Sequence, residues 1–450
     1  MKFLTASAAI AQVIEHQISV SEILNRSLQR IYAREYEVKA WTFLAVEAAH
    51  RQMAIQAEYD RACSPADRLT QSPLLGIPVG IKDIFATVDM PTAWGLPLYR
   101  DRYLPTEATV VTRLKAAGAI ILGKTVTTEL ATAAAGPTRN PHNLRHTPGG
   151  SSSGSAAAVA DGMVPVAIGS QTMGSILRPA AYCGIFGFKP SFSRIDRHGV
   201  MPVSTDLDHV GIFARCLDDM QRVFEVLVDR QPTLPEPETS ALSFSLTQPP
   251  RLAWVPTPDW SLIDPLVQER LQRIVQVLSP SATALTRVDL PTTDLDYWAT
   301  TQTLCAYGLY QHHSGLLNNH RSVCSPQLQD WLQRGQAIDS SAYGTALRTQ
   351  KQFQASMDTL LSEFDAILTP VTPGPAPRGL DNTGSPRFCS LWTLCGLPAI
   401  TLPIGKTPGG LPLACQLVGR RNGDRQLLHL AQYCWEQVLS AVGGIVVPAQ

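Results

Sequence analysis

Near the N-terminus of the chain, apolar residues recur at the spacing of a helix. Ser19 and Glu22 stand three positions apart, which is the pattern of a capping box at a helix start. The apolar positions that follow are Leu24, Leu28, Ile31 and Tyr32. This spacing predicts an N-terminal helix with one buried face, whose role is packing and not catalysis.

From Leu74 onward the spacing becomes that of a strand. Residues 77–81 alternate between apolar and small side chains, and this run leads directly to Lys82. A helical pattern over residues 110–117 is closed by Gly118, and the apolar run 119–122 follows at once. Strand, helix and strand in this order predict a βαβ unit.

The rest of the chain repeats this alternation. Helices are expected at 156–160 and 427–438, and strands at 164–168, 184–189, 366–368, 399–402 and 412–418. Prolines between residues 231 and 250 mark an irregular connector, and the segment from there to about 363 reads as mainly helical. Strands near both ends of the chain, without a clean linker between them, predict one large α/β domain over residues 1–450 with a variable, mainly helical insert at about 231–363.

Composition and charge narrow the classes of function. Of the 450 residues 44% are hydrophobic and 16% charged, which suits a globular protein with a large core. The 37 basic and 37 acidic residues cancel and form no block, so neither nucleic acid nor a membrane surface is an expected partner. Nine scattered cysteines without a CxxC pair favour reduced thiols and a cytoplasmic location, and no apolar run reaches the roughly 18 residues of a membrane span.

Candidate chemistry is concentrated in two turns rich in serine, glycine and threonine. They lie at 149–155 and 171–175 and flank one predicted strand. Such residues are ordinary turn formers, but that explanation fits a single turn better than two in tandem. Residues 118–125 match the phosphate-binding P-loop pattern literally, yet their middle is the apolar run of a predicted strand, which cannot wrap a phosphate.

Two hydrolytic arrangements remain. Residues 150–154 match the nucleophile elbow G-x-S-x-G, which would make Ser152 the nucleophile, but an elbow needs a strand directly before it, and Pro148 and Gly149 make a turn there. The histidines available as its base lie in no recognisable context: His198, His209, His313 and His429. The other arrangement pairs a serine with Lys82, which can act as a base if burial lowers its pKa from about 10.4.

The order and spacing of longer motifs favour the second arrangement. Residues 76–83, 147–160, 174–175, 179–181 and 184–190 closely resemble the amidase signature family, and further likeness runs through 123–125, 138–141, 207–211, 368–370 and 396–399. The resemblance covers nearly the whole chain, more thinly from 231 to 363. It implies the amidase signature fold, which is a large mixed β-sheet covered by helices on both faces.

The resemblance also assigns roles to residues. Lys82 would be the base, Ser151 a bridging serine in a cis peptide with Gly150, and Ser175 the nucleophile. Backbone N–H groups of Thr172, Met173, Gly174 and Ser175 would form the oxyanion hole, and Ser152, Gln171 and Arg178 would support these turns. The reaction would need neither a metal nor an organic cofactor. The resemblance implies a small-molecule amide as substrate and is compatible with a homodimer.

The chain departs from the family pattern at four positions. Many members have Asp in place of Gln171, glycine in place of Met173, arginine in place of Leu177 and glycine in place of Ser153. An arginine does stand one position later, as Arg178. Residues 171–179 resemble a sub-branch of the family with the pattern Gln-Thr-x-Gly-Ser-x-x-Arg-Pro, so the departures are interpreted as variation within a subfamily.

Three functions follow as hypotheses. The first is a free-standing amidase that releases ammonia or an amine from a carboxamide. The second is the glutamine-hydrolysing A-type subunit of a tRNA-dependent amidotransferase, ranked lower because Gln171 and Met173 break the Asp-containing pattern expected there. The third is a scaffold that keeps the fold without catalysis, which the presence of Lys82, Ser151 and Ser175 disfavours.

Overall fold

A computed structural model describes residues 4–62, 64, 70–132, 134–229, 250–257, 259–278, 284–290 and 295–436. Its helices are α1 (Ala6–Ile14), α2 (Val20–Val38), α3 (Val46–Ala62), α5 (Thr109–Ala116), α6 (Ser153–Ala160), α7 (Leu177–Cys183), α8 (Leu217–Leu227), α9 (Pro265–Leu278), α10 (Tyr297–Asn319), α11 (Pro326–Gln336), α12 (Ser340–Glu363), α13 (Arg387–Leu394) and α14 (Asp424–Cys434). Its strands are β1 (Trp41–Leu44), β2 (Pro78–Lys82), β3 (Ile120–Thr125), β4 (Val166–Gln171), β5 (Phe186–Lys189), β6 (His209–Ala214), β7 (Arg251–Trp254), β8 (Ala284–Arg287), β9 (Ala366–Pro370), β10 (Ala399–Lys406) and β11 (Pro412–Gly419).

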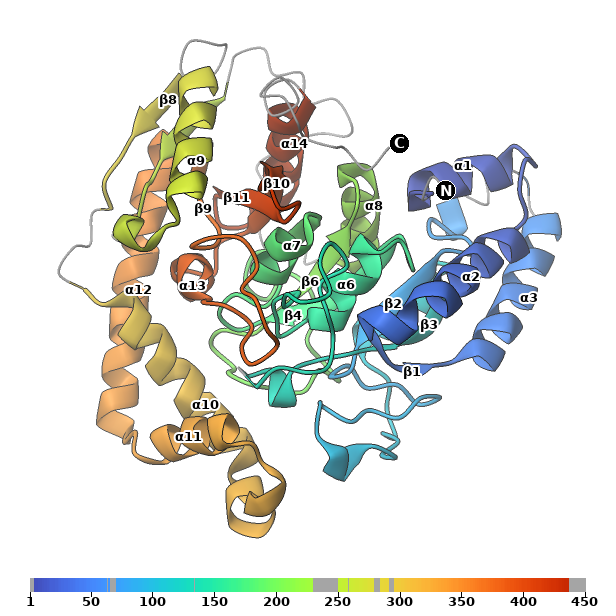
Figure 1. Cartoon of the computed structure of the whole chain (residues 1–450), viewed down its shortest axis with the longest axis horizontal. Helices are drawn as coiled ribbons and strands as arrows, with labels where there is room; N and C mark the ends of the chain where they lie inside the picture. The colour runs from blue at the N-terminus through green and yellow to red at the C-terminus, as the bar shows by residue number, and fades with distance from the viewer. Residues whose placement is uncertain are drawn as a thin grey trace.

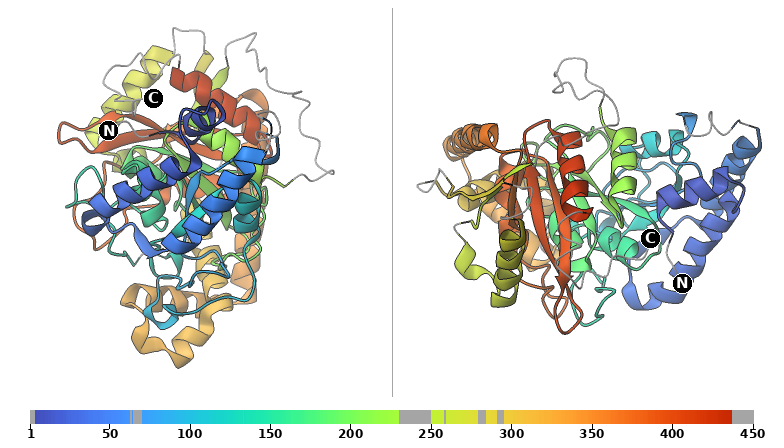
Figure 2. Two further views of the ribbon diagram at one scale, coloured as in Figure 1. Left: turned by 90° about the vertical axis from the view of Figure 1, so that its right-hand side faces the viewer. Right: turned by 90° about the horizontal axis from the view of Figure 1, so that it is seen from above.

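These strands join into one mixed sheet of eleven strands, in the order β1-β3-β2-β4-β6-β5-β10-β11-β9-β7-β8. Strand β2 is parallel to β3 and β4, and β7 is parallel to β8 and β9, whereas the other neighbours are antiparallel. Helices lie on both sides of this sheet (Figures 1 and 2). The predicted α/β class with a large mixed sheet is therefore confirmed.

The predicted βαβ unit is present as β2, α5 and β3. All residues of β2 and β3 are buried, which explains why β3 begins as a continuous apolar run and why the positions between the apolar residues of β2 are small. Gly118 has a φ of +88° just after α5, so the glycine ends the helix as expected. Because β2, β3 and β4 are parallel, their carboxyl ends meet at one edge of the sheet, where ligand sites of α/β proteins commonly form. Lys82 stands at that edge.

Helices α6 and α7 begin at the same edge and pack against each other and the sheet (Figure 1). The helix expected at 156–160 begins earlier, at Ser153, so part of the first hydroxyl-rich segment is helical and not a turn. Strand β4 spans Val166–Gln171 where 164–168 was expected, and it leads directly into the second hydroxyl-rich turn. Gly184, expected in a strand, instead ends α7 with a left-handed φ of +66°.

The region predicted to be a mainly helical insert contains two short strands as well as helices. It contains α9 to α12, of which α10 and α11 project below the sheet in Figure 1, but it also supplies the strands β7 and β8 at one edge of the sheet. Each of these two strands has only four residues. In β7 three of the four are buried, and in β8 Thr286 and Arg287 are exposed, so neither strand shows a clear alternation. The connector expected at 231–250 lies, except for Pro250, outside the described residues, as does Val438 of the last predicted helix.

The N-terminal capping box is also confirmed. The Ser19 hydroxyl accepts from the backbone N–H of Glu22, and the Glu22 carboxylate accepts from the backbone N–H of Ser19, at the start of α2. Within the described parts of the chain, no helix is long and apolar enough to span a bilayer.

Close packing of α6 against the site-bearing strands leads to a prediction. A methyl group on Gly154 would lie 2.2 Å from the carbonyl oxygen of Ala40 and 2.4 Å from the backbone nitrogen of Val126, whereas one on Gly315 of α10 would meet nothing within 4 Å. We expect Gly154→Ala to lower the free energy of unfolding by about 1–3 kcal/mol. Gly315→Ala, the matched control, should raise it by up to about 1 kcal/mol, because alanine favours helix. Denaturant unfolding measures both, and equal effects would contradict the packing.

Candidate active site

Lys82 lies at the carboxyl end of β2 with its amine completely buried. Its Nζ is 2.7 Å from the Ser151 Oγ and 2.8 Å from the Ser170 Oγ, and it donates to both hydroxyls in this arrangement. Lys82 and Ser151 are 69 positions apart in the sequence, and the packing of α6, which begins two residues after Ser151, against β2 brings their segments together. The structure thus joins two of the three residues predicted to be catalytic.

The surroundings of Lys82 favour its neutral form. Burial holds the pKa of the amine well below its usual range, the Asp208 carboxylate opposes this shift, and Arg178 adds to it. Among the described residues, Lys82 forms no ion pair with a carboxylate, and its two partners are hydroxyls. A hydroxyl can donate as well as accept, so a neutral amine keeps both contacts by donating to one serine and accepting from the other.

Ser151 is held through its backbone. The peptide bond between Gly150 and Ser151 is cis, as the family resemblance implies. The Ser151 carbonyl accepts from the backbone N–H of Thr128 at 3.1 Å. Arg178 of α7 donates from Nε at 3.2 Å and from Nη2 at 2.6 Å to the Gly150 carbonyl, and its Nη1 donates to the Gly384 carbonyl. Arg178 therefore ties the start of α7 to the segment that carries Ser151.

The other serines of this segment are occupied with backbone groups. The Ser152 hydroxyl donates to the Ser170 carbonyl at 3.2 Å and accepts from its N–H at 3.3 Å. Ser153 bonds to the Val126 carbonyl, and Ser155 to the Ile168 carbonyl and the Thr125 hydroxyl. No strand leads directly into Ser152, so the geometry disfavours the nucleophile elbow.

Ser175 closes the turn between β4 and α7 and is 6% exposed. Within the described residues its hydroxyl makes no hydrogen bond, so the structure joins Lys82 to Ser151 and leaves the contact from Ser151 to Ser175 unmade. Catalytic hydrogen bonds are often long without substrate, which keeps Ser175 a candidate nucleophile. Arg178, three residues after Ser175, donates to the Gly150 carbonyl and so links the two hydroxyl-rich segments.

The turn before Ser175 fits its side chains without backbone strain. Met173, one of the four departures from the family pattern, is not among the described non-glycine residues with positive φ, and its partly buried side chain packs against the core. Gly174 needs to be glycine for another reason, because a methyl group there would lie 2.9 Å from the Cβ of Pro386, just before α13. Methionine at 173 is thus compatible with the turn, whereas a side chain at 174 is not.

Polar side chains hold both sides of this turn. The Gln171 amide oxygen accepts from the N–H groups of Ile176 and Leu177, which are among the free N–H groups at the start of α7. The Thr172 hydroxyl donates at 2.6 Å to Asp208, whose other oxygen accepts from the N–H groups of Val203 and Ser204. Burial raises the pKa of Asp208, but all three partners are donors, which is the arrangement that a carboxylate requires.

Three residues of this arrangement received no role from the sequence. The Ser170 hydroxyl accepts from Lys82. Asp208 accepts from Thr172 and acts on Lys82 through its charge. Thr393 of α13 accepts from Gln171. Asp208 lies in a motif shared with the amidase signature family and directly precedes β6, whose first residue pairs with the last residue of β4. The motif could therefore have indicated Asp208 from the sequence. The contacts of Ser170 and Thr393 depend on how β4 and α13 pack, so the sequence carries no signal for these two residues.

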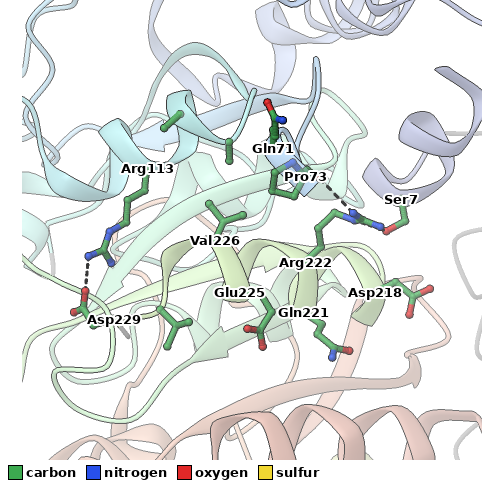
Figure 3. A pocket seen from close by; sticks show the side chains of 13 residues that line it. Ser7, Gln71, Pro73, Arg113, Asp218, Gln221, Arg222, Glu225, Val226 and Asp229 are labelled. Carbon is green, nitrogen blue, oxygen red and sulfur yellow. Dashed lines mark hydrogen bonds and ion pairs between the residues drawn. The ribbon is translucent and has the colours of Figure 1, made fainter. Parts of the chain in front are cut away.

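A pocket of about 1180 Å³ elsewhere in the molecule is not part of this arrangement (Figure 3). It lies between α1, α5 and α8, and its lining includes the ion pair of Arg113 with Asp229 and the side chain of Arg222, which donates to the Pro73 carbonyl. None of the residues predicted to be catalytic lines it. The pocket is therefore no evidence against the candidate site at Lys82.

Comparison with known proteins defines the class of this protein. The model of the Amidase family matches residues 22–428, which is most of the chain. This chain belongs to the amidase family, and C–N bond hydrolysis is the reaction class that this membership supports.

The similar proteins include amidotransferase subunits and amidases. The chain is 32% identical to the A-type subunit of the glutamyl-tRNA(Gln) amidotransferase of Symbiobacterium thermophilum, with 92% of this chain and 93% of that protein covered. Among solved structures it is similar to a protein described as an amidase, with a TM-score of 0.85, 28% identity and 97% and 100% of the two chains covered. It is also similar to the corresponding A-type amidotransferase protein of Thermotoga maritima, with a TM-score of 0.77, 26% identity and 96% and 94% covered.

Proposed function

We propose that the protein hydrolyses the C–N bond of a carboxamide with Ser175 as nucleophile, Ser151 as proton relay and Lys82 as base. The observation that carries this proposal is the buried contact between the Lys82 Nζ and the Ser151 Oγ at 2.7 Å. A serine hydroxyl becomes nucleophilic when a neighbouring base removes its proton. An amine whose pKa is lowered by burial, at the carboxyl edge of the sheet, supplies that base.

The reaction then proceeds in two halves. Neutral Lys82 accepts the Ser151 proton while Ser151 accepts that of Ser175, whose Oγ attacks the amide carbonyl carbon. Ser151 next donates a proton to the leaving nitrogen, the C–N bond breaks, and ammonia or an amine departs. Water then attacks the acyl-enzyme with the same groups as base and acid, and this step releases the carboxylic acid and Ser175.

The negative charge on the carbonyl oxygen is the main electrostatic demand of both halves. Backbone N–H groups of residues 172–175 are the proposed donors, and one such donor is typically worth about 2.7–4 kcal/mol in the transition state. Side-chain identity matters little for this task, which is consistent with methionine at 173. The side chains of Gln171 and Thr172 instead fix the path of the backbone.

The comparisons favour the amidotransferase setting over the free-standing enzyme that the sequence ranked first. A-type subunits of glutamyl-tRNA(Gln) amidotransferases match this chain over nearly its full length. The first setting that we propose is therefore a complex with a B-type partner, in which glutamine is the amide donor. The free-standing amidase stays the second, because the similarity to the solved amidase has the higher TM-score, 0.85 against 0.77.

Replacing the proposed catalytic groups tests the reaction itself. Ser175→Ala should reduce amide hydrolysis to background, and Lys82→Ala should lower kcat by about 100-fold or more, as expected for loss of a general base. Ammonia or amine release by the purified protein is the measurement. Exposed residues of the same type, Ser362→Ala and Lys351→Ala on α12, serve as controls with unchanged rates. Undiminished hydrolysis in both site variants would contradict the proposal, whereas a wild-type protein without any amide hydrolysis would support the scaffold.

The two settings differ in substrate and partner. In the amidotransferase setting, L-glutamine should be the best substrate, and co-expression with a B-type partner should give a stable complex whose glutaminase rate rises with tRNA. In the free-standing setting, the protein alone should hydrolyse a member of a carboxamide panel faster than glutamine. Steady-state kinetics and co-purification measure this difference, and the amidotransferase setting is contradicted if neither partner nor tRNA changes the rate.

The charge of Asp208 gives a pH-dependence prediction. Activity requires neutral Lys82, so kcat/KM should fall as the pH drops through the pKa of that amine. The Asp208 carboxylate raises this pKa, so Asp208→Asn should lower it and move the acid limb of the pH–rate profile to lower pH. Asp330→Asn, which removes a half-exposed carboxylate on α11, should leave the limb in place. A limb that stays or moves to higher pH in Asp208→Asn would contradict the proposed role of Lys82.

A further inference from the structure

The amide of Gln171 uses both of its ends inside the protein. Its oxygen accepts from the N–H groups of Ile176 and Leu177 at 2.8 and 3.0 Å, just beyond the proposed oxyanion turn. Its nitrogen donates at 2.8 Å to the hydroxyl of Thr393, a residue of α13 that is 222 positions away. Gln171 and Thr393 are almost fully buried, so water does not compete for these contacts.

The Thr393 hydroxyl continues this connection back to the turn. It lies 3.0 Å from the Met173 carbonyl oxygen and 3.1 Å from the Cys389 carbonyl oxygen one helical turn earlier. A hydroxyl has one proton to donate and accepts through its lone pairs. Because Gln171 donates to it, its own proton is directed toward these two carbonyls. The contacts from Gln171 through Thr393 to Met173 therefore close a loop across the turn.

Planarity of the peptide bond gives this loop a consequence. The Met173 carbonyl and the Gly174 N–H belong to one peptide unit, whose atoms lie close to a plane with the two groups pointing in opposite directions. A contact that fixes the carbonyl oxygen therefore also fixes the direction of the Gly174 N–H. That N–H is one of the donors proposed for the oxyanion.

The peptide between Met173 and Gly174 also packs closely against the start of helix α13. A methyl group on Gly174 would lie 2.9 Å from Pro386 and 3.2 Å from the Cβ of Cys389. This packing limits movement of the peptide toward α13, and the contact with the Thr393 hydroxyl limits rotation of the peptide plane. A misplacement of about 1 Å near the reacting atoms can cost about 100-fold in rate, so support of this peptide bears on the chemical step.

We propose that Thr393 is a positioning residue, which orients the Gly174 N–H toward the oxyanion by holding the Met173 carbonyl, and that Gln171 holds Thr393 in turn. This role rests on the proposed function, because it presumes that the turn 172–175 stabilises the oxyanion. It predicts an effect on the chemical step and none on substrate binding, since neither side chain is part of the proposed donor set.

The test compares Thr393→Val with Thr393→Ser. Valine keeps the shape and removes the hydroxyl, and serine keeps the hydroxyl. On the best amide substrate, L-glutamine or a panel carboxamide, Thr393→Val should lower kcat about 10- to 100-fold with KM within about twofold of wild type. Its second-order rate of inactivation by a fluorophosphonate should fall in parallel, and Thr393→Ser should recover most of both losses. Thr301→Val is the control, because Thr301 of α10 is equally buried and donates only to its own helix.

Gln171→Glu breaks the same contact from the other side and is the variant to use if Thr393→Val does not fold. It keeps the oxygen that binds α7 and replaces the nitrogen that donates to Thr393. We expect the same loss in kcat, and a double variant should lose no more than the worse single one, because both changes remove one interaction.

The outcomes separate this role from the proposed function. A wild-type protein that neither hydrolyses amides nor reacts with the fluorophosphonate overturns the proposed function and this role together. A reactive wild type that Thr393→Val matches in kcat and inactivation rate overturns the role of Thr393 alone. An equal loss in Thr393→Ser, or a loss confined to KM, also overturns it.

Discussion

The site depends on one buried amine that has hydroxyls, and no carboxylate, as its direct partners among the described residues. Lys82 is fully enclosed, and its Nζ lies 2.7 Å from Ser151 and 2.8 Å from Ser170. Burying a charged ammonium without a counter-ion is costly, so the amine gives up its proton more readily than in water. The same burial that disfavours the charge makes the amine a base at moderate pH. The proposed chemistry follows from this constraint, because Lys82 is the base that the structure places in contact with Ser151.

Polar side chains around the amine act almost entirely on the backbone. Arg178 binds the Gly150 carbonyl, Ser152 binds both backbone groups of Ser170, and Asp208 binds Thr172 and two N–H groups of the preceding loop. Such contacts fix the course of two turns instead of touching a substrate. They also explain how the chain accommodates Gln171, one of its departures from the family pattern, since its amide oxygen accepts from the first N–H groups of α7 without requiring a negative charge.

Local features of the fold were predictable from the sequence, whereas contacts between distant segments were not. The capping box at Ser19 and the β2-α5-β3 unit follow from spacing within a few tens of residues, and both are confirmed. Strands β7 and β8 were missed, because four residues are too few to give a readable alternation. The pairing of Lys82 with Ser151 came from the resemblance to a family, and no local pattern would have selected that lysine. Thr393 could not be found at all, since its contact with Met173 joins positions 220 residues apart.

The claim that Ser175 is the nucleophile of this arrangement is tested most directly by peptide mapping after reaction with a fluorophosphonate. Mass spectrometry of the digested protein should place the phosphonyl group on Ser175, and the label should disappear in Lys82→Ala treated for the same time. A label on Ser152 would instead support the nucleophile-elbow arrangement that the geometry disfavours. Label on any residue other than Ser175, in a protein that hydrolyses amides, would contradict the account.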